Sequence, residues 1–328
     1  MPPGPLGDSP LDTQRLRLVG GRIVQTIPVM LLATFVVFGL MHLVPGDPAV
    51  TLAGEYATPQ RVGEIRRLYG FDQPFLTQYW TWLSNALQGD LSRSLRSNAE
   101  VSSLIAQRFP NTLLIVVLAL VLSMAIGVPL GILAATRSGS RLDSAVTSVS
   151  SLGVALPNFW LAMILVTVFA LGLHWFPATG AKPLSQGVGP ALLHAVLPAI
   201  ALASSGVAEV TRQLRSALLE VLSSQYVRTL HAKGLPPLAI LLKHGLKNVS
   251  VNLLTVFGLL VNRMLGGTVI IEAVFAVPGM GSLVIAGATT KDFPVVQGVV
   301  LTLVILVVLT NLAIDMLYTL FDPRIGRD

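Results

Sequence analysis

Few residues of this chain could do chemistry in an apolar environment, and an arginine is the clearest of them. Arg263 lies in an otherwise uncharged run, next to Asn262 and eleven residues after Asn252. An arginine within such a run usually faces protein or a water-filled cavity and has a partner. The three residues therefore suggest either a structural pairing or the lining of a pathway, and the sequence leaves both interpretations open.

Two carboxylates lie near the ends of other apolar runs. Asp315 follows Asn311 by four residues and precedes Tyr318 by three, so these side chains share a helix face. We expect a hydrogen-bonding cluster between packed helices there. Glu209 is the other carboxylate, and a transporter driven by protons or ions would use such groups along its path.

Motifs for catalysis are missing from the sequence. It has no G-x-x-x-x-G-K-[ST] loop for phosphate, no H-E-x-x-H and no G-x-S-x-G. It has no cysteine, which excludes disulfides, thiolate metal sites and cysteine nucleophiles. We therefore predict no catalytic residue, no metal site and no cofactor bound by this chain. If ATP drives the protein, another subunit must hydrolyse it.

Composition indicates which elements must position these residues. Of 328 residues, 53% are apolar and 12% are charged, about half of the roughly 25% charged residues usual in soluble domains. Such a chain cannot cover a water-facing surface, which excludes a soluble enzyme and a nucleic-acid-binding module. Since a bilayer takes ~20 helical residues, the uncharged runs predict an all-α integral membrane protein with six transmembrane helices: 23–44, 110–135, 157–173, 194–214, 249–270 and 295–318.

Two of these spans need comment. The third is expected to follow, and not to include, the Ser- and Gly-rich stretch 144–153. The fifth contains Arg263, but the thirteen Val, Leu, Ile and Phe residues of 249–271 outweigh the cost of one central arginine.

The distribution of Lys and Arg predicts the orientation. With the N-terminus inside, thirteen positive residues lie on the cytoplasmic side, whereas the short external loops carry only Lys182 and Lys291. Positive residues in short loops favour the cytoplasm. We therefore expect cytoplasmic tails at 1–22 and 319–328, and a core of five helices within 109–318.

Residues 45–108 are the part that resembles a soluble domain. Thr58-Pro59 begins a helical pattern that Gly70 ends, and a second apolar run extends from Phe75 to Ala86. We expect a small external helical segment that packs its aromatic residues on itself and on the outer ends of the spans. Shaping an outer vestibule or docking a partner is the further possibility.

An amphipathic elbow is predicted at about residues 216–247, between the fourth and fifth spans. Leu219, Leu222, Tyr226 and Leu230 recur near the helical period, and Gly234 supplies a left-handed stop. The proline pair after it suits the first turn of a new helix, which would continue into span five. A basic elbow of this kind fits a groove on a partner protein or a headgroup surface.

The elbow also carries a resemblance to a known family. Its run YVRTLHAKG, from Tyr226 to Gly234, and the run Lys243 to Asn248 resemble the cytoplasmic loop of binding-protein-dependent ABC importer permeases of the dipeptide/oligopeptide/nickel group. Further runs match this family in order at 45–48, 70–74, 78–80, 89–94, 108–112, 267–275, 278–281, 292–294 and 322–324. Two departures are Leu230-His231, where relatives commonly have Ala-Arg, and Asn252, where they often have Pro.

The resemblance implies a type I ABC transmembrane domain that forms one pathway with a second, homologous permease. It implies one or two cytoplasmic ABC ATPase subunits that bind ATP and Mg, and an extracytoplasmic solute-binding protein, in the cell membrane of a prokaryote. In this family the elbow fits a cleft on the ATPase, so the coupling positions are expected at Tyr226, Arg228, Leu230, Ala232, Lys233 and Gly234.

A second group is expected on the external side, after span five. Glu272, Phe275, Pro278, Gly279 and Gly281 are predicted to form an outer loop that reaches toward the pathway or the binding protein. A turn that simply packs spans five and six together is the alternative.

The expected substrates are di- or oligopeptides, because the external segment has no histidine cluster that would argue for nickel. Nickel or another small ligand, a stand-alone secondary transporter, and a membrane scaffold or receptor are the alternatives.

Overall fold

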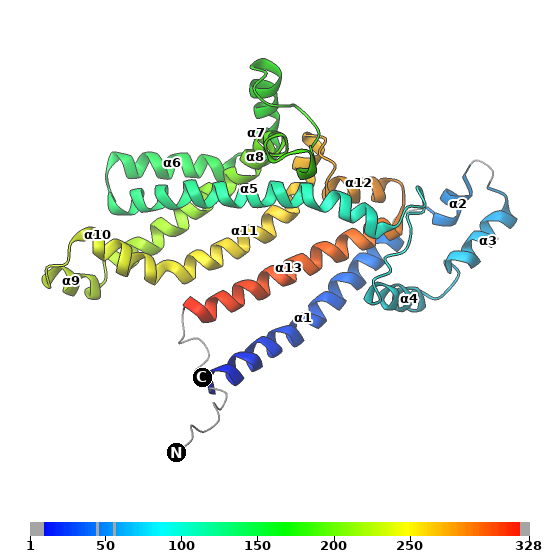
Figure 1. Cartoon of the computed structure of the whole chain (residues 1–328), viewed down its shortest axis with the longest axis horizontal. Coiled ribbons are helices and arrows are strands. Elements are labelled where there is room, and N and C mark those ends of the chain that lie inside the picture. Colours follow the sequence, from blue (N-terminus) through cyan, green and yellow to red (C-terminus); the bar gives the residue numbers. More distant parts are fainter. Residues whose placement is uncertain (1–9, 44–45, 55–56, 322–328) are drawn as a thin grey trace.

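The long uncharged runs of the sequence form long helices. The computed structural model describes residues 10–43, 46–54 and 57–321, and within them the backbone is mainly helical (Figure 1). Four helices are long and apolar enough to cross a membrane: α5 (Val101–Thr136), α8 (Val188–Leu222), the helix Pro237–Val274 that includes α11 (Leu246–Val274), and α13 (Phe293–Phe321). These helices confirm the predicted second, fourth, fifth and sixth spans.

The first predicted span lies in α1 (Pro10–Leu43), which runs beside α13 (Figure 1). The apolar part whose side chains are described, Val24–Leu40, is shorter than the other spans. The predicted tail at 1–22 includes residues 1–9, which lie outside the described residues, while the backbone of 10–22 belongs to α1. Within the C-terminal tail predicted at 319–328, residues 322–328 also lie outside them.

The third span differs from the prediction. The Ser- and Gly-rich stretch is helical, as part of α6 (Arg141–Ala155). It is followed by α7 (Asn158–Leu165) and the π-helical turn Val166–Gly172. These elements form a possible span only when taken together, and the chain bends by 97° between α6 and α7. Ser140 caps α6 by accepting a hydrogen bond from the Asp143 amide at 3.2 Å. The sequence placed this stretch before the span, but in the structure its small residues allow α6 to approach α8: a Cβ on Gly153 would lie 3.2 Å from the Ala208 Cβ.

Helices α5 and α8 form the centre of the bundle, and glycines bring them close together. A Cβ on Gly127 would lie 2.8 Å from the Val210 Cβ, and one on Gly131 would lie 3.0 Å from the Leu214 Cβ. Small residues four apart allow two membrane helices to pack at short range. The main hydrophobic core lies here, with α11 and α7 packed against the pair.

The external segment has the predicted helices. They are α3 (Pro59–Tyr69) and α4 (Phe75–Leu87), with a short α2 (Pro48–Ala53) before them. Thr58 caps α3 through the Arg61 amide at 3.3 Å, and Gly70 ends it at φ 69°. The helix of the second span begins at Val101, so residues 101–108 of the predicted external segment form the first turns of α5.

Aromatic residues of α4 pack on α1, as expected. Tyr79 and Trp82 are buried with Phe38, and the Tyr79 ring lies 5.5 Å from the Phe38 ring in an edge-on arrangement. A second attachment is Asp292, between α12 (Met280–Thr289) and α13, which accepts hydrogen bonds from the Ser94 hydroxyl at 2.5 Å and the Leu95 amide at 3.0 Å.

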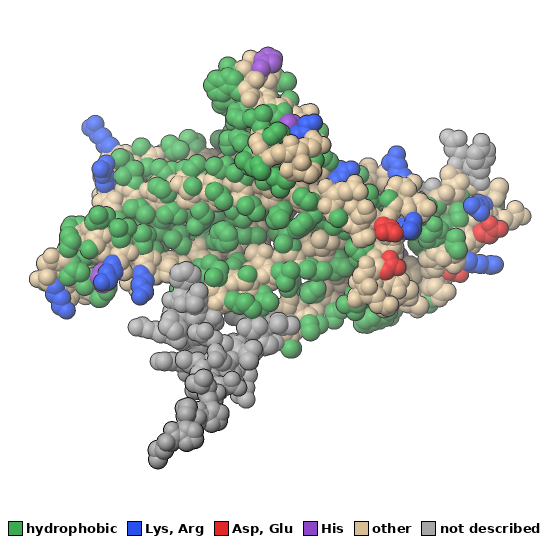
Figure 2. All heavy atoms as spheres, in the orientation of Figure 1, with side chains coloured by type: hydrophobic (Ala, Val, Ile, Leu, Met, Phe, Trp, Pro, Cys, Tyr) green, Lys and Arg blue, Asp and Glu red, His purple; other side chains and the backbone are tan. Residues whose placement is uncertain are grey.

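The elbow and the external segment lie at opposite ends of the bundle (Figure 1). Figure 2 shows hydrophobic side chains over the middle of the displayed face, with Lys and Arg gathered near α9 and acidic and basic side chains together near α2 to α4. An apolar band between two charged ends is the pattern of a chain that spans a membrane.

Candidate functional site

The predicted elbow is a separate short helix. Helix α8 ends at Leu222, and α9 (Gln225–Ala232) begins after Ser224, whose hydroxyl accepts a hydrogen bond from the Val227 amide at 3.4 Å. Gly234 follows at φ 80°, and the Leu235 amide donates to the Leu230 carbonyl at 3.2 Å. The helical stop predicted from Gly234 is therefore confirmed.

The chain then turns into the next long helix as predicted. Pro237 occupies the first turn of α10 (Pro237–Ala239), and a π-helical stretch (Ile240–Gly245) joins α10 to α11. The elbow is thus held between the ends of α8 and α11, so a movement of α9 would act on both helices.

The buried face of the elbow differs from the predicted one. Val227 and Leu230 are buried against Ile240, with Leu222 and Leu235 around them. Tyr226, which was predicted on this apolar face, is exposed. That prediction assumed one continuous helix, whereas the chain breaks between α8 and α9. Leu230 holds α9 against the next helix and does not belong to the exposed surface.

The exposed face carries the other residues at which coupling was predicted, which are Tyr226, Arg228, Ala232, Lys233 and Gly234. The Tyr226 hydroxyl lies 2.8 Å from Nδ1 of His244 and so links α9 to the π-helical stretch. Residues 225–247 contain four Lys or Arg and no Asp or Glu. The elbow therefore presents a cationic surface with one aromatic ring, which suits an acidic or polar groove.

The intramembrane arginine has a carboxylate partner. Arg263 Nη1 on α11 lies 3.7 Å from Glu209 Oε2 on α8, and Arg212 Nη2 lies 3.2 Å from the same oxygen. The Arg263 side chain is 55% exposed on the surface of this chain. The structure thus pairs two residues that the sequence treated separately, and it leaves the arginine on a face that a second subunit or a pathway could adjoin.

The neighbouring asparagines do not form one group with Arg263. Asn262 Nδ2 donates to Asn311 Oδ1 on α13 at 3.2 Å, on another side of α11. Asn252 is exposed, three turns and ~16 Å from Arg263 along the helix. The structure therefore does not bring the three residues of this predicted set together.

The polar cluster predicted near the end of the last span joins α13 to α11. Asn311 accepts the hydrogen bond from Asn262, and the Tyr318 hydroxyl donates to Thr255 Oγ1 at 2.6 Å. The predicted cluster between packed helices is thus confirmed for Asn311 and Tyr318.

The residues predicted on an outer loop are largely internal. Glu272 lies in the last turn of α11 with its side chain fully buried, and Phe275 is 1% exposed. The Glu272 carboxyl group accepts hydrogen bonds from the Thr112 hydroxyl at 2.5 Å and the Ser282 amide at 2.9 Å. Glu272 thus belongs to α11 and not to the predicted outer loop, while Phe275 lies in the turn after α11 with its side chain buried.

The turn after α11 is shaped by the same carboxyl group. A Cβ on Gly279 would lie 2.3 Å from the Glu272 side chain, and one on Gly281 would lie 2.5 Å from the Val269 Cα. The carbonyl of Pro278 accepts a hydrogen bond from the Asn111 side chain at 2.8 Å. These contacts tie α5, α11 and α12 together, in agreement with the alternative of a turn that packs the spans together.

One pair was not identified from the sequence. Arg215 Nε and Nη2 donate to the two Asp143 carboxylate oxygens at 2.6 and 2.8 Å, which fixes α6 to α8 near the elbow. Two parallel hydrogen bonds of this kind give geometric specificity as well as attraction. The residues are 72 apart in the chain, so no local spacing indicates the pair.

Comparison with known proteins identifies relatives over nearly the whole chain. Residues 127–327 match the model of the family described as binding-protein-dependent transport system inner membrane component, and residues 15–116 match the N-terminal model of such membrane components. No group of three His, Asp or Glu residues that could hold a metal occurs among the described residues.

Among the curated relatives is a probable peptide ABC transporter permease of Sinorhizobium fredii, 41% identical, with 93% of this chain and 97% of the relative covered. An oligopeptide transport system permease of Bacillus subtilis is 38% identical over the same shares. A chain of the MetNI methionine ABC transporter in an inward-facing conformation has a similar fold, with a TM-score of 0.55 and 21% identity over 67% of this chain and 97% of that one.

Proposed function

This chain belongs to the family of inner-membrane components of binding-protein-dependent transport systems, and on that premise we propose that it is one permease subunit of an ATP-driven peptide importer. It is a multi-pass membrane protein whose fold resembles that of a type I ABC transmembrane domain. A second, homologous permease would complete the pathway, one or two ABC ATPases would bind and hydrolyse ATP with Mg, and an extracytoplasmic binding protein would deliver the solute.

The elbow is the observation that carries this proposal. A short capped helix at one end of the bundle buries one apolar face on its own chain and exposes a cationic face with Tyr226. The exposed face is free to enter a groove of an ATPase, while the buried face transmits the movement to α8 and α11. In this proposal Arg228, Ala232, Lys233 and Gly234 contact the ATPase, and Leu230 stiffens the connection.

The opposite end of the bundle would face outward, toward the binding protein. The excess of positive residues at the elbow end favours the cytoplasm for that end. Both chain termini would then be cytoplasmic, in the inner or plasma membrane of a prokaryote, and the external segment of α2 to α4 would lie outside.

The pathway would adjoin the exposed face of α11 near Arg263, with Asn252 on the same helix closer to the elbow. Closure of the ATPases would shift α9 and switch the bundle between inward-open and outward-open states. A nearly complete switch, from 1:99 to 99:1, requires about 5.5 kcal/mol of difference in partner binding between the two states. Several desolvated contacts at the elbow would have to supply it.

Peptides are the proposed substrates because the relatives in question are named for peptide, oligopeptide and dipeptide transport. The alignments with these relatives cover 93% or more of this chain. This coverage supports the same class of substrate for this chain. Nickel or another small ligand would be indicated by a binding protein that holds such a ligand in place of a peptide.

The test is reconstitution of the four components in vesicles. The complex should import a radiolabelled dipeptide when ATP and the binding protein are supplied from their proper sides. The double substitution Arg228→Glu and Lys233→Glu should leave insertion and basal ATP hydrolysis intact but remove transport. Lys182→Glu, which reverses a charge on an exposed residue far from the elbow along the sequence, is the matched control.

Two outcomes would refute the proposal. Uptake that follows a proton gradient and continues without ATPases would make the chain a secondary transporter. Failure of the ATPases and second permease to co-purify with it, together with unchanged peptide uptake after deletion of the gene, would favour a scaffold or receptor.

A further inference from the structure

Helix α4 of the external segment carries an apolar stripe on its exposed surface. The stripe consists of Leu76, Trp80 and Leu87, and each of these side chains is more than half exposed. At ~100° of rotation per residue, the three positions fall within about 40° of one another on the helix. An exposed apolar surface of this kind marks a contact with another protein or with a membrane. The surroundings of α4 decide between the two.

A second face of α4 is packed on the membrane bundle, and it fixes the depth of the helix. Tyr79, Trp82 and Leu83 are buried in one cluster with Phe38 of α1 and Leu301 of α13. Because Leu301 belongs to a helix that crosses the membrane, its place along α13 measures how deep this cluster lies.

The cluster lies below the surface of the hydrocarbon core. The span Phe293–Tyr318 has 26 residues, so it is ~39 Å long and extends ~4–5 Å beyond a ~30 Å hydrocarbon core at each end. Leu301 is eight residues from Phe293, a rise of ~12 Å. The cluster is therefore ~7–8 Å inside the hydrocarbon core. Amphipathic helices that rest on a bilayer bury their apolar face by about 5–10 Å, which is the same range.

Contacts with α1 indicate a similar depth independently. The Tyr79 hydroxyl donates a hydrogen bond to the Leu31 carbonyl at 3.3 Å, and Oε1 of Gln78 lies 3.2 Å from Nε2 of His42. Leu31 lies twelve residues before Leu43, where α1 ends, a distance of ~18 Å along the helix. Helix α4 thus lies beside the outer half of the predicted first span and does not stand above it in water.

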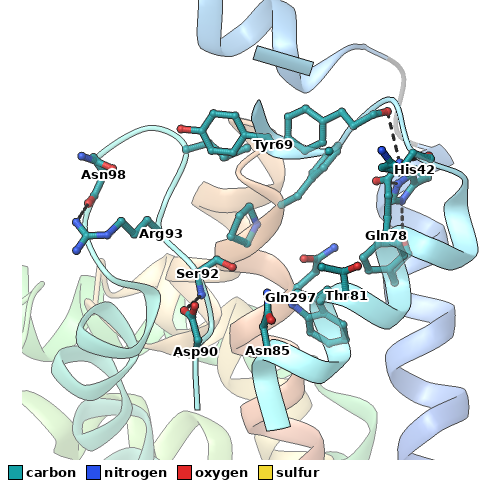
Figure 3. Close-up of a pocket in the computed structure, with 18 residues that line it drawn as sticks. His42, Tyr69, Gln78, Thr81, Asn85, Asp90, Ser92, Arg93, Asn98 and Gln297 are labelled. Atoms are coloured by element: carbon teal, nitrogen blue, oxygen red, sulfur yellow. Dashed lines mark hydrogen bonds between the residues drawn. The ribbon is translucent and has the colours of Figure 1, made fainter. Parts of the chain in front are cut away.

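The third face of α4 is polar and borders a cavity of ~500 Å³ (Figure 3). Gln78, Thr81 and Asn85 line this cavity from α4, and the loop with Asp90 and Arg93 lines it from another side. The charged residues place the cavity on the water side of α4. The three polar positions lie about 120–180° around the helix from the apolar stripe. The stripe therefore points away from water and toward the hydrocarbon.

The distribution of charge separates α4 from its neighbour α3. The sequence has no Asp, Glu, Lys or Arg between Asp72 and Asp90, whereas α3 carries three arginines and one glutamate among its 11 residues. A charged side chain is costly in hydrocarbon, and tryptophan is enriched where a membrane meets water. Helix α3 is thus suited to water, and α4 is suited to the interface.

Two protein partners fit the stripe less well than lipid does. A binding protein would approach from water, on the side of the cavity and of α3, which is opposite the stripe. A second permease at the exposed face of α11 would be separated from α4, because α13 lies between α11 and α1 (Figure 1). The exposed apolar surface of α1, in contrast, extends to α4 through Phe35, whose ring lies 5.5 Å from that of Phe75.

We propose that α4 is an interfacial helix whose apolar stripe is immersed in the lipid leaflet at the end of the bundle opposite the elbow. This leaflet is the outer one in the orientation proposed above. The helix anchors the external segment on the bilayer and holds α2 and α3 above it in water. The inference concerns this chain and lipid, and it does not depend on which solute the complex carries.

Spin labels test this placement directly, because the chain has no cysteine of its own. Leu76→Cys and Leu87→Cys each receive a nitroxide label in the assembled permease–ATPase complex, in phosphatidylcholine nanodiscs. The matched controls are the next residues in the chain, Thr77→Cys and Gln88→Cys, which are exposed on the polar side. The wild-type complex, treated in the same way, gives the signal from cysteines of the other subunits.

The measurement compares collisions of each nitroxide with molecular oxygen, which concentrates in hydrocarbon, and with a water-soluble nickel complex. The labels at 76 and 87 should collide more with oxygen than with the nickel complex. The labels at 77 and 88 should show the reverse order. Addition of the binding protein should leave the collisions at 76 and 87 unchanged.

Three results would overturn the inference. If the stripe faces water, all four labels collide readily with the nickel complex. If a second permease covers it, the labels at 76 and 87 are shielded from oxygen and from the nickel complex alike. If shielding develops only after the binding protein is added, the stripe is a docking surface for that protein.

Thermal melting of each labelled complex shows whether it is folded, and the two stripe positions keep the test valid if one of the variants is not. Peptide uptake is measured on the same complexes with the binding protein supplied. Normal uptake with a stripe that faces water or protein refutes the lipid contact alone, whereas lack of uptake in the wild-type complex bears only on the proposed function.

Discussion

Replacement of Gly234 tests whether the shape of the elbow matters for coupling. Gly234 ends α9 at φ 80°, where residues with a Cβ are strained, yet no atom lies within 4 Å of the position that a Cβ would take. A substitution thus has room and meets only the conformational penalty. For Ala this penalty is about 1–2 kcal/mol, and it is larger for the β-branched Val.

A penalty of about 1–2 kcal/mol reduces the population of the native elbow relative to alternative turns by a factor of about 5–30. We therefore expect Gly234→Ala to lower the ATP hydrolysis that substrate-loaded binding protein stimulates, and Gly234→Val to abolish it, with insertion unchanged. Asn tolerates the left-handed region better because its side chain can hydrogen-bond locally. Gly234→Asn should accordingly retain more coupling than Gly234→Ala.

The order of the three variants separates two causes. If the backbone conformation decides, coupling decreases from Asn to Ala to Val. If a side chain at this exposed position simply clashes with the ATPase, the larger Asn is worse than Ala. Wild-type coupling in Gly234→Val, measured as stimulated over basal ATP hydrolysis in reconstituted vesicles, would refute the reasoning.

Three further changes test how the bundle is held together. Gly281→Ala would place its Cβ 2.5 Å from the Val269 backbone and should cost about 1–3 kcal/mol of stability, measured by thermal unfolding in detergent. The control Gly266→Ala has no atom within 4 Å of its Cβ and should be neutral or stabilising. Asp143→Ala and Arg215→Ala should each lower the melting temperature, because each removes the same bidentate pair. The double variant should therefore melt no lower than the less stable single variant. Additive losses in melting temperature would contradict this. Burial acts to raise the pKa of Asp47, but hydrogen bonds from Arg66 and the Ala49 amide outweigh it and hold the pKa below 3.8. The ion pair of Asp47 with Arg66 should therefore stabilise the α2–α3 contact fully above about pH 4, by at most about 1 kcal/mol. This stabilisation should be lost as the pH falls through the lowered pKa. Amide exchange of the wild type and of Asp47→Asn is compared across this range, and a difference that persists at pH 2 would contradict the prediction.

Much of the architecture follows from local sequence. Long uncharged runs predict membrane helices because the length of a span is set by the bilayer. Thr58 and Gly70 predict the ends of α3, and Gly234 predicts the end of α9, because caps and left-handed turns depend on neighbouring residues. These features require no knowledge of what the helices touch.

Other features depended on contacts between distant residues. The stretch before Pro157 was expected to lie outside the third span, but its small residues pack closely on α8 and it is helical. The face of the elbow was misplaced because a break at Ser224 reset the helical phase. Neither could be read from spacing, since one depends on a neighbouring helix and the other on a cap that competes with helix continuation.

The sequence by itself determined the second, fourth, fifth and sixth spans, the helices α3 and α4, the basic elbow and its glycine stop, because hydrophobic length, capping and turn residues act over a few positions. The tertiary structure alone decided which polar groups meet. It turned Glu272 inward to Thr112, joined Arg263 to Glu209, and buried Trp82 Nε1 without a hydrogen-bond partner. Such pairings depend on how distant helices pack, and this arrangement is fixed by the whole bundle and not by the residues on either side.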